Sequence, residues 1–308
     1  MENNHSCLKI VSRPSDFLAG VSSPIPFKSI RPSGDWTSSD KFFERQSFGN
    51  FDTEGCVVFA CQETIDAQID YLIQSGQIDT NLLELFNKLG FMDSVNSLDG
   101  VSHFHSSARY LQSLTGNGYN GNTLSDPFDA ARKYGIIPFA SLPFDATITE
   151  AEYLMNPMPQ NLLNIGQQFL LAVGGKNWLN YQWIVNNQPT NTQAMDTARQ
   201  QAPLVIAVLA EVPGWNQYEP PIVQGPPCHG VQNYNSIATG ELVLDHYVPF
   251  DKVLQPGFNI NYVLQGVVNI VPPPPAPVPP TVPPTPPNYS AWQKFLIALK
   301  AWLQSLNQ

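Results

Sequence analysis

Apolar residues recur at helical spacing through the stretch that follows Cys56. The stripe consists of Val58, Cys61, Ile65, Ile69 and Leu72. Residues three and four apart share one face of an α-helix, so this pattern indicates an amphipathic helix that buries one side. Gly76 stands where such a helix would stop, because glycine readily adopts the left-handed conformation of a C-terminal cap.

Shorter segments of the same kind follow in the first half of the chain. Residues 81–91, 106–116 and 124–136 each combine apolar spacing of three or four with polar residues between. Gly135 marks the end of the last of these segments. The first half of the chain is therefore predicted to be helical.

The second half carries a different pattern. Residues 203–210 (PLVIAVLA) form a continuous apolar run, which suits a buried strand. Residues 230–250 read as two strands about a turn at Thr239 and Gly240. A helical half followed by a strand-rich half predicts an α+β fold with a cleft between the two parts.

A proline-rich segment at 272–287 marks a domain boundary. Eleven of its sixteen residues are proline, and proline lacks the backbone donor that helices and sheets need. We expect a stiff polyproline II linker. A ligand for a proline-reading partner is the alternative.

Residues 288–308 after this linker predict one amphipathic helix. Its apolar face is formed by Trp292, Phe295, Leu296, Leu299, Trp302, Leu303 and Leu306. A lone helix cannot bury such a stripe, so docking on a protein partner or self-association is expected. Its polar face carries few lysines, which makes a membrane surface the less favoured partner.

Composition narrows the class of protein. Charged residues make up 13% of the chain, and the net charge is −10, so no basic surface favours nucleic acid. No apolar stretch is long enough to span a bilayer, and the N-terminus shows no signal-peptide pattern. We therefore expect a cytoplasmic or virion-associated protein with reduced thiols.

Cys56 and Cys61 lie on the same predicted helix but in different settings. Asp52 or Thr53 can cap the helix, which places Cys56 at its N-terminus, where the helix dipole favours a thiolate. Cys61 lies five residues on, inside the apolar stripe, and a helix cannot bridge the two. Cys61 is thus a core residue, whereas Cys56 is either a packing residue or a nucleophile.

A thiolate nucleophile needs a base and an acceptor that orients the base. His229 begins the first strand of the predicted hairpin, and Asp245 follows sixteen residues later. Adjacent antiparallel strands would bring this carboxylate beside the imidazole. His103 and His105 alternate on one face and could ligate a metal, but no third ligand stands at a suggestive spacing.

The order Cys56, His229, Asp245 resembles that of the papain-like cysteine peptidases. Residues 107–144 resemble that family's pattern of helix, Gly/Asn-rich loop, second helix and run into Pro-Phe. Residues 194–210 resemble the helix and strand before the catalytic histidine, and 229–235 (HGVQNYN) resembles the strand that carries it. The resemblance covers about residues 40–250.

This resemblance implies a papain-like peptidase domain at 40–271, preceded by an extension at 1–39. Cys56 would be the nucleophile, His229 the general base and acid, and Asp245 the orienter. Gln46 would donate to the oxyanion, with Asn50 as the alternative donor. No metal or organic cofactor is implied, and the substrate would be a peptide or protein.

The sequence also departs from the family pattern. Asn50 stands where a glutamine is usual, Val57 replaces a bulky aromatic residue, and Asp245 replaces the commoner asparagine. These departures suggest a divergent member of phage or microbial type. Two alternatives follow: an inactive papain-like structural or assembly protein, such as a phage virion component, and a cell-wall peptide amidase.

Overall fold

The structure is a computed structural model that describes residues 8–9, 25–39, 41–49, 51–210 and 212–270. The chain divides into two units, Met1–Pro273 and Pro274–Gln308. The proline-rich segment and the C-terminal helix expected at 288–308 lie outside the described residues. The linker and the docking helix therefore stay predictions.

Helices occupy most of the first half of the described chain, and each of the four predicted ones is present. The α-helices are α1 (Cys56–Gln74), α2 (Thr80–Leu89), α3 (Ala108–Thr115), α4 (Asp126–Tyr134), α5 (Glu150–Tyr153), α6 (Gln160–Ala172) and α7 (Thr192–Arg199). Short 3-10 helices are η1 (Thr37–Ser39), η2 (Phe139–Ser141) and η3 (Gly175–Trp178). Beyond the end of α1, Gly76 has a left-handed φ of 67°, as predicted.

The cap of α1 differs from the expectation. Gly55 is the N-cap residue, and no side chain caps the helix. The prediction that Asp52 or Thr53 caps it is wrong, because the helix begins directly after Gly55. The Asp52 carboxylate instead accepts a hydrogen bond from the backbone N–H of Glu54 at 3.0 Å, within the turn that leads into the helix.

Strands build two antiparallel sheets. β1 (Met92–Asp93) pairs with β2 (His103–Phe104). The main sheet contains β3 (Leu179–Asn186), β4 (Leu204–Val208), β5 (His229–Ile237), β6 (Gly240–Leu244), β7 (Asp251–Leu254) and β8 (Tyr262–Val268). Its order is β3-β8-β4-β5-β6-β7. β5 and β6 are the predicted hairpin, whereas β3, β7 and β8 were not predicted.

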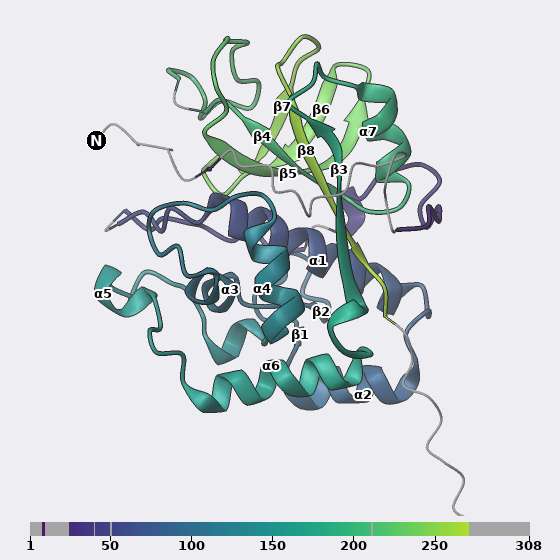
Figure 1. The fold of residues 1–308 in the computed structure, drawn as a ribbon, viewed down its shortest axis with the longest axis vertical. Coiled ribbons are helices and arrows are strands. Elements are labelled where there is room, and N and C mark those ends of the chain that lie inside the picture. The colour runs from purple at the N-terminus through teal and green to yellow at the C-terminus, as the bar shows by residue number, and fades with distance from the viewer. Residues whose placement is uncertain (1–7, 10–24, 40, 50, 211, 271–308) are drawn as a thin grey trace, which may run out of the picture. The chain divides into compact units, whose positions relative to one another are not determined.

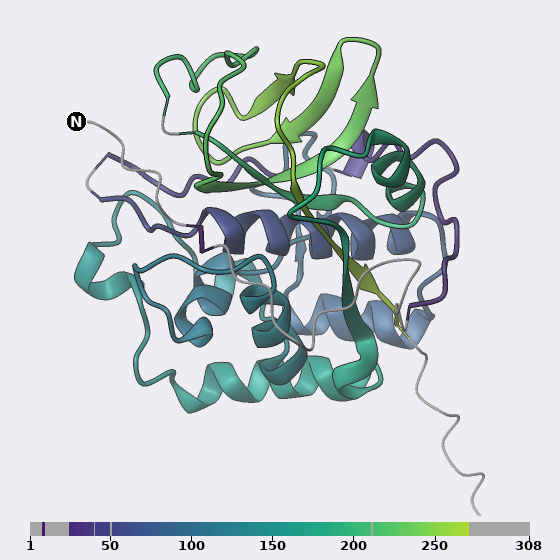
Figure 2. The same ribbon diagram turned by 45° about the horizontal axis from the view of Figure 1, so that its top comes forward.

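α1 lies between the main sheet and the other helices of the first half (Figures 1 and 2). Its first fifteen residues are all buried. Gln68 joins it to β8, since its amide donates to the Gly266 carbonyl at 3.0 Å and accepts from the Val268 N–H at 2.9 Å. The observed α+β layering matches the predicted fold class.

Two apolar cores lie on opposite faces of β4. Val205 and Ala207 contribute to the core around α1, whereas Leu204, Ile206 and Val208 contribute to a second core that includes residues of α7. Alternate residues of a strand face opposite sides, so a strand covered on both sides must be apolar throughout. This arrangement explains the continuous apolar run in the sequence.

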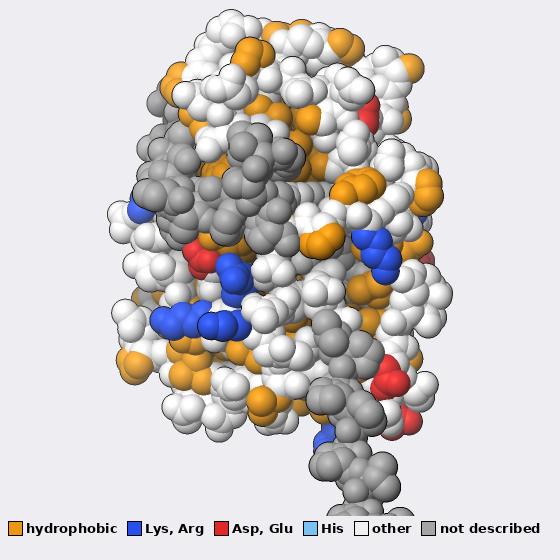
Figure 3. Space-filling model, turned by 45° about the vertical axis from the view of Figure 1, so that its right-hand side comes forward, with side chains coloured by type: hydrophobic (Ala, Val, Ile, Leu, Met, Phe, Trp, Pro, Cys, Tyr) orange, Lys and Arg blue, Asp and Glu red, His pale blue; other side chains and the backbone are white. Residues whose placement is uncertain are grey.

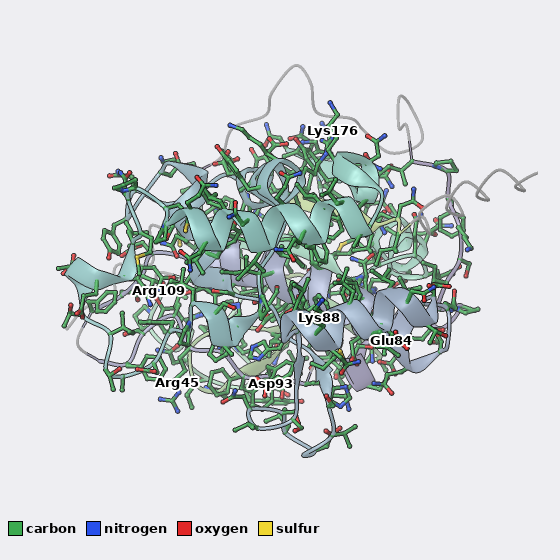
Figure 4. The ribbon with its side chains drawn as sticks, turned by 90° about the horizontal axis from the view of Figure 1, so that it is seen from below. Arg45, Glu84, Lys88, Asp93, Arg109 and Lys176 are labelled. Atoms are coloured by element: carbon green, nitrogen blue, oxygen red, sulfur yellow. The ribbon has the colours of Figure 1, made fainter. Side chains whose placement is uncertain are left out.

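α2 and α6 lie side by side on the far side of the helical layer (Figure 4). Phe86 of α2 stacks on Phe169 of α6, with ring centroids 5.9 Å apart. Few charged side chains appear on the face shown in Figure 3, in keeping with the low charged content. Among the described helices, none has the length and apolar character to cross a membrane.

Candidate active site

Cys56 lies where α1 meets the main sheet. It is the first residue of α1 and is fully buried. Its sulfur accepts a hydrogen bond from the backbone N–H of Gly230, the second residue of β5, at 3.3 Å. A Cβ on Gly230 would lie 2.9 Å from a methyl carbon of Val57. Only glycine permits so close an approach of β5 to the start of α1.

His229 and Asp245 form a buried pair next to this contact. His229 opens β5, and Asp245 follows β6 directly. The two strands are adjacent and antiparallel, so the hairpin brings the two side chains together. His229 Nε2 lies 2.7 Å from Asp245 Oδ1. The structure therefore places the imidazole and the carboxylate side by side, as the sequence predicted.

Two further side chains hold the Asp245 carboxylate. Trp215 Nε1 donates to Oδ2 at 2.9 Å, and Lys252 Nζ lies 2.9 Å from the same oxygen. Burial by itself would raise the pKa of Asp245, but the charges and hydrogen bonds of His229 and Lys252 outweigh it. The pKa of Asp245 is therefore well below its usual range, and the group stays anionic.

Trp215 and Lys252 were not identified from the sequence. Trp215 comes from the connection between β4 and β5, and its ring meets the His229 ring edge-on at 5.8 Å. No local pattern relates its position to the imidazole. Lys252 had a weak signal, because extending the hairpin by one more strand would have placed it on β7, opposite Val243.

Gln46 lies on a loop that folds back toward α1. Ser47 and Asp52 form an antiparallel bridge within this loop. The buried Gln46 amide donates to Asp52 Oδ1 at 2.9 Å and to the Tyr247 hydroxyl at 2.6 Å. The Tyr247 hydroxyl in turn donates to the other oxygen of Asp52. Asn50, the alternative oxyanion donor, lies outside the described residues.

The cysteines are not all reduced. Cys56 is disulfide-bonded, whereas Cys61 is a free thiol. The expectation of reduced thiols is therefore wrong for Cys56. The Cys61 thiol contacts the Leu124 carbonyl at 3.5 Å, and burial raises its pKa well above the usual value. Cys61 is thus a core residue, as predicted.

Cys228 and the histidine pair also have defined surroundings. Cys228 packs against the second core, on the side of the sheet away from α1. His103 lies between Asp70 and Asp99, and His105 lies between Asp93 and Glu44. Among the described residues, no group of three or more His, Cys, Asp or Glu side chains could hold a metal ion. Both imidazoles are engaged by carboxylates.

Comparisons with known proteins identify the fold. No family model and no curated protein matches the sequence. The procathepsin L2 proteinase of the Tenebrio molitor larval midgut matches with a TM-score of 0.51 and 14% identity, over 85% of this chain and 77% of that chain. Procathepsin L 3 from the same tissue gives 0.50 and 15%, over 86% and 77%.

A third solved structure is the Carica candamarcensis cysteine protease CMS1MS2 in complex with E-64, with a TM-score of 0.48 and 12% identity. It covers 76% of this chain and 97% of that chain. At these identities the similarity to the two procathepsins concerns the fold. The described chain has an α+β papain-like fold and is structurally similar to papain-like cysteine proteases at low sequence identity.

Proposed function

We propose that this protein is a cysteine peptidase that hydrolyses peptide bonds through Cys56, His229 and Asp245. The observation that carries the proposal is the meeting of α1 and β5. The first residue of β5 is the imidazole paired with Asp245, and its second residue contacts the Cys56 sulfur. A helix N-terminus favours the thiolate form of a cysteine, and a nucleophilic thiolate needs a base that a third group orients. The meeting of α1 and β5 supplies the helix N-terminus and the oriented imidazole on neighbouring elements.

The reaction starts from the reduced form of Cys56. Asp245 accepts from His229 Nε2, which leaves Nδ1 to take the proton of the thiol. The thiolate attacks the peptide carbonyl, and the imidazolium then protonates the leaving amine. His229 next removes a proton from water, which hydrolyses the acyl-enzyme and releases Cys56.

The oxyanion of the tetrahedral intermediate needs donors that are already in place. The backbone N–H of Cys56, at the start of α1, is one candidate. The Gln46 amide is the other, and its contacts with Asp52 and Tyr247 fix its orientation. For Gln46 to donate to the oxyanion, one of these two hydrogen bonds has to give way.

Peptide hydrolysis by the reduced protein tests the proposal. Protein treated with dithiothreitol should cleave a denatured protein substrate, and Cys56→Ala should abolish the cleavage. Cys61→Ala is the matched control, because it removes a buried thiol from the same helix. Equal cleavage by wild type and Cys56→Ala would refute the proposed nucleophile.

A second candidate is a papain-like protein that no longer turns over substrate. The disulfide at Cys56 favours it, since the sulfur is not nucleophilic in that state. Labelling with an E-64-type epoxide near pH 6 after reduction separates the two. Rapid, selective labelling of Cys56 over Cys61 and Cys228 supports the peptidase, whereas uniformly slow labelling supports the structural protein.

The roles in a virion and in cell-wall cleavage stay predictions. The assembly role depends on the C-terminal segment, which lies outside the described residues. A wall-peptide amidase would use the same Cys56 and His229 chemistry on a different substrate, so assays with wall peptides would distinguish it from a general peptidase.

A further inference from the structure

Lys252 is a fully buried cation behind the proposed catalytic pair. Its ammonium group lies 2.9 Å from Asp245 Oδ2 and donates to the backbone carbonyls of Tyr247 at 3.0 Å and Pro249 at 2.5 Å. Both Lys252 and Asp245 have fully buried side chains. Burial of an ion pair is costly, and its net contribution to stability is often small. Stability alone therefore does not account for a lysine at this buried position.

The Asp245 carboxylate already has a neutral hydrogen-bond donor, Trp215, so Lys252 is not needed merely to supply a hydrogen bond. The Trp215 indole N–H donates to the same oxygen, Oδ2, at 2.9 Å. What Lys252 adds is a positive charge that balances Asp245. With Lys252 present, the group that orients His229 is a neutral ion pair rather than an isolated carboxylate.

We propose that Lys252 is a positioning residue that sets the charge balance at His229. The Asp245–Lys252 pair orients the imidazole while adding no net charge behind it. If the proposed function holds, the charge that stabilises the imidazolium then comes mainly from the Cys56 thiolate. The ionised form of Cys56 and the ionised form of His229 then each depend on the other for stabilisation.

Two further titratable groups close to His229 in the described part of the chain are neutral around pH 7. The Tyr247 ring lies 5.7 Å from the imidazole, and burial raises its pKa far above the usual value. Burial lowers the pKa of His246 to about 4. The Asp52 carboxylate accepts a hydrogen bond from the Tyr247 hydroxyl. Under the proposed function, the Cys56 thiolate is the anion that pairs with the imidazolium.

A purely structural role for Lys252 is the competing explanation, since its contacts with Tyr247 and Pro249 also hold the loop between β6 and β7. A loop-holding residue would change the melting temperature and leave the titration of His229 in place. A charge-balancing residue would move that titration in a direction set by the charge that is removed.

NMR titration of the His229 ring signals in the reduced protein tests the proposal without any turnover. In Lys252→Met, the titration midpoint should rise by about 1 to 2 pH units, because an unbalanced anion favours the imidazolium. In Asp245→Asn, which leaves Lys252 as an unbalanced cation, the midpoint should fall. The double variant Asp245→Asn/Lys252→Met should return close to the wild-type midpoint.

Trp215→Phe is the matched control, because it removes a donor to the same oxygen without changing any charge. Its midpoint should move far less than that of Lys252→Met. Equal shifts in these two variants, or a double variant that keeps the shift of either single one, would overturn the proposal. If Lys252→Met does not fold, Asp245→Asn and the double variant still decide the outcome. If the reduced protein cleaves no peptide but its variants show these shifts, only the proposed function is refuted, and the role of Lys252 stands.

Discussion

Gly230 and Val57 show how single residues set the geometry of the site. Gly230 brings β5 against the first turn of α1, so that its N–H reaches the Cys56 sulfur. Val57 occupies the space that a side chain at position 230 would need. Val57 stands where the resembled family usually has a bulky aromatic residue. The absence of a side chain at Gly230 and the modest size of Val57 together allow this close approach.

We expect Gly230→Ala to damage both the fold and the site. The added methyl would meet Val57 at 2.9 Å, and overpacking of this kind costs about 1–3 kcal/mol. Denaturant unfolding measures the loss, and epoxide labelling of reduced Cys56 reports on the site. The double variant Gly230→Ala/Val57→Ala should recover part of both. A Gly230→Ala protein with unchanged unfolding free energy and an unchanged labelling rate would contradict this account.

The three residues proposed to react could be predicted from the sequence more readily than the residues that support them. Cys56 could be located from the start of an apolar stripe, and His229 and Asp245 from a hairpin. Each of these residues belongs to a helix or a hairpin that is continuous in sequence, so local spacing is enough to find it. Trp215 could not be found, because it reaches Asp245 from a connection without regular structure. The Cys56 disulfide was not predicted either, because the composition led us to expect reduced thiols.

At the scale of elements, His105 ties together three segments of the helical half. Its ring nitrogens lie 2.9 Å from Asp93 at the end of β1 and 2.8 Å from Glu44 in the loop before α1. Its ring is stacked between Phe42 and Phe139, with centroids 3.7 and 4.3 Å away. Two carboxylates on one imidazole favour its charged form.

This cluster predicts a loss of stability at alkaline pH. Burial alone would lower the pKa of His105, but hydrogen bonds with Asp93 and Glu44 raise it to about 9. The folded pKa exceeds the unfolded value of about 6.5. The stabilisation is therefore fully present below about pH 6.5 and is lost as the pH rises through 9.

His105→Gln should remove this dependence. The unfolding free energy of wild type minus that of the variant should be about 3 kcal/mol larger at pH 6 than at pH 10, from the size of the shift. Urea unfolding at a series of pH values measures it. Gln160→Ala, at an exposed position on α6, controls for general effects of pH. A difference that does not vary with pH would contradict this role of His105 and its two carboxylates.

At the scale of the whole molecule, α1 is the element on which both halves are built. It is covered by the sheet on one side and by helices on the other, and the candidate site lies at its N-terminal end (Figure 2). The apolar periodicity predicted this helix and its neighbours. The strands β3, β7 and β8 were missed. The pairing of β3 with β8 joins segments that are far apart in the sequence, so no local pattern indicated it.

The first unit should fold without the second. We expect a chain ending at Pro273 to melt within about 2 °C of the full chain, less than the loss of 1 kcal/mol produces in a domain of this size. Differential scanning calorimetry of both chains, under reducing and non-reducing conditions, measures this. A much lower melting temperature for the shorter chain would show that residues 274–308 stabilise the first unit.

The central claim is that His229 activates Cys56, and labelling kinetics test it most directly. Reduced wild type should take up one E-64-type epoxide per chain at Cys56 near pH 6. His229→Ala should react at least about 100-fold more slowly, the usual minimum effect of removing a general base. Equal rates in the two proteins, or labelling of Cys228 in place of Cys56, would contradict the claim.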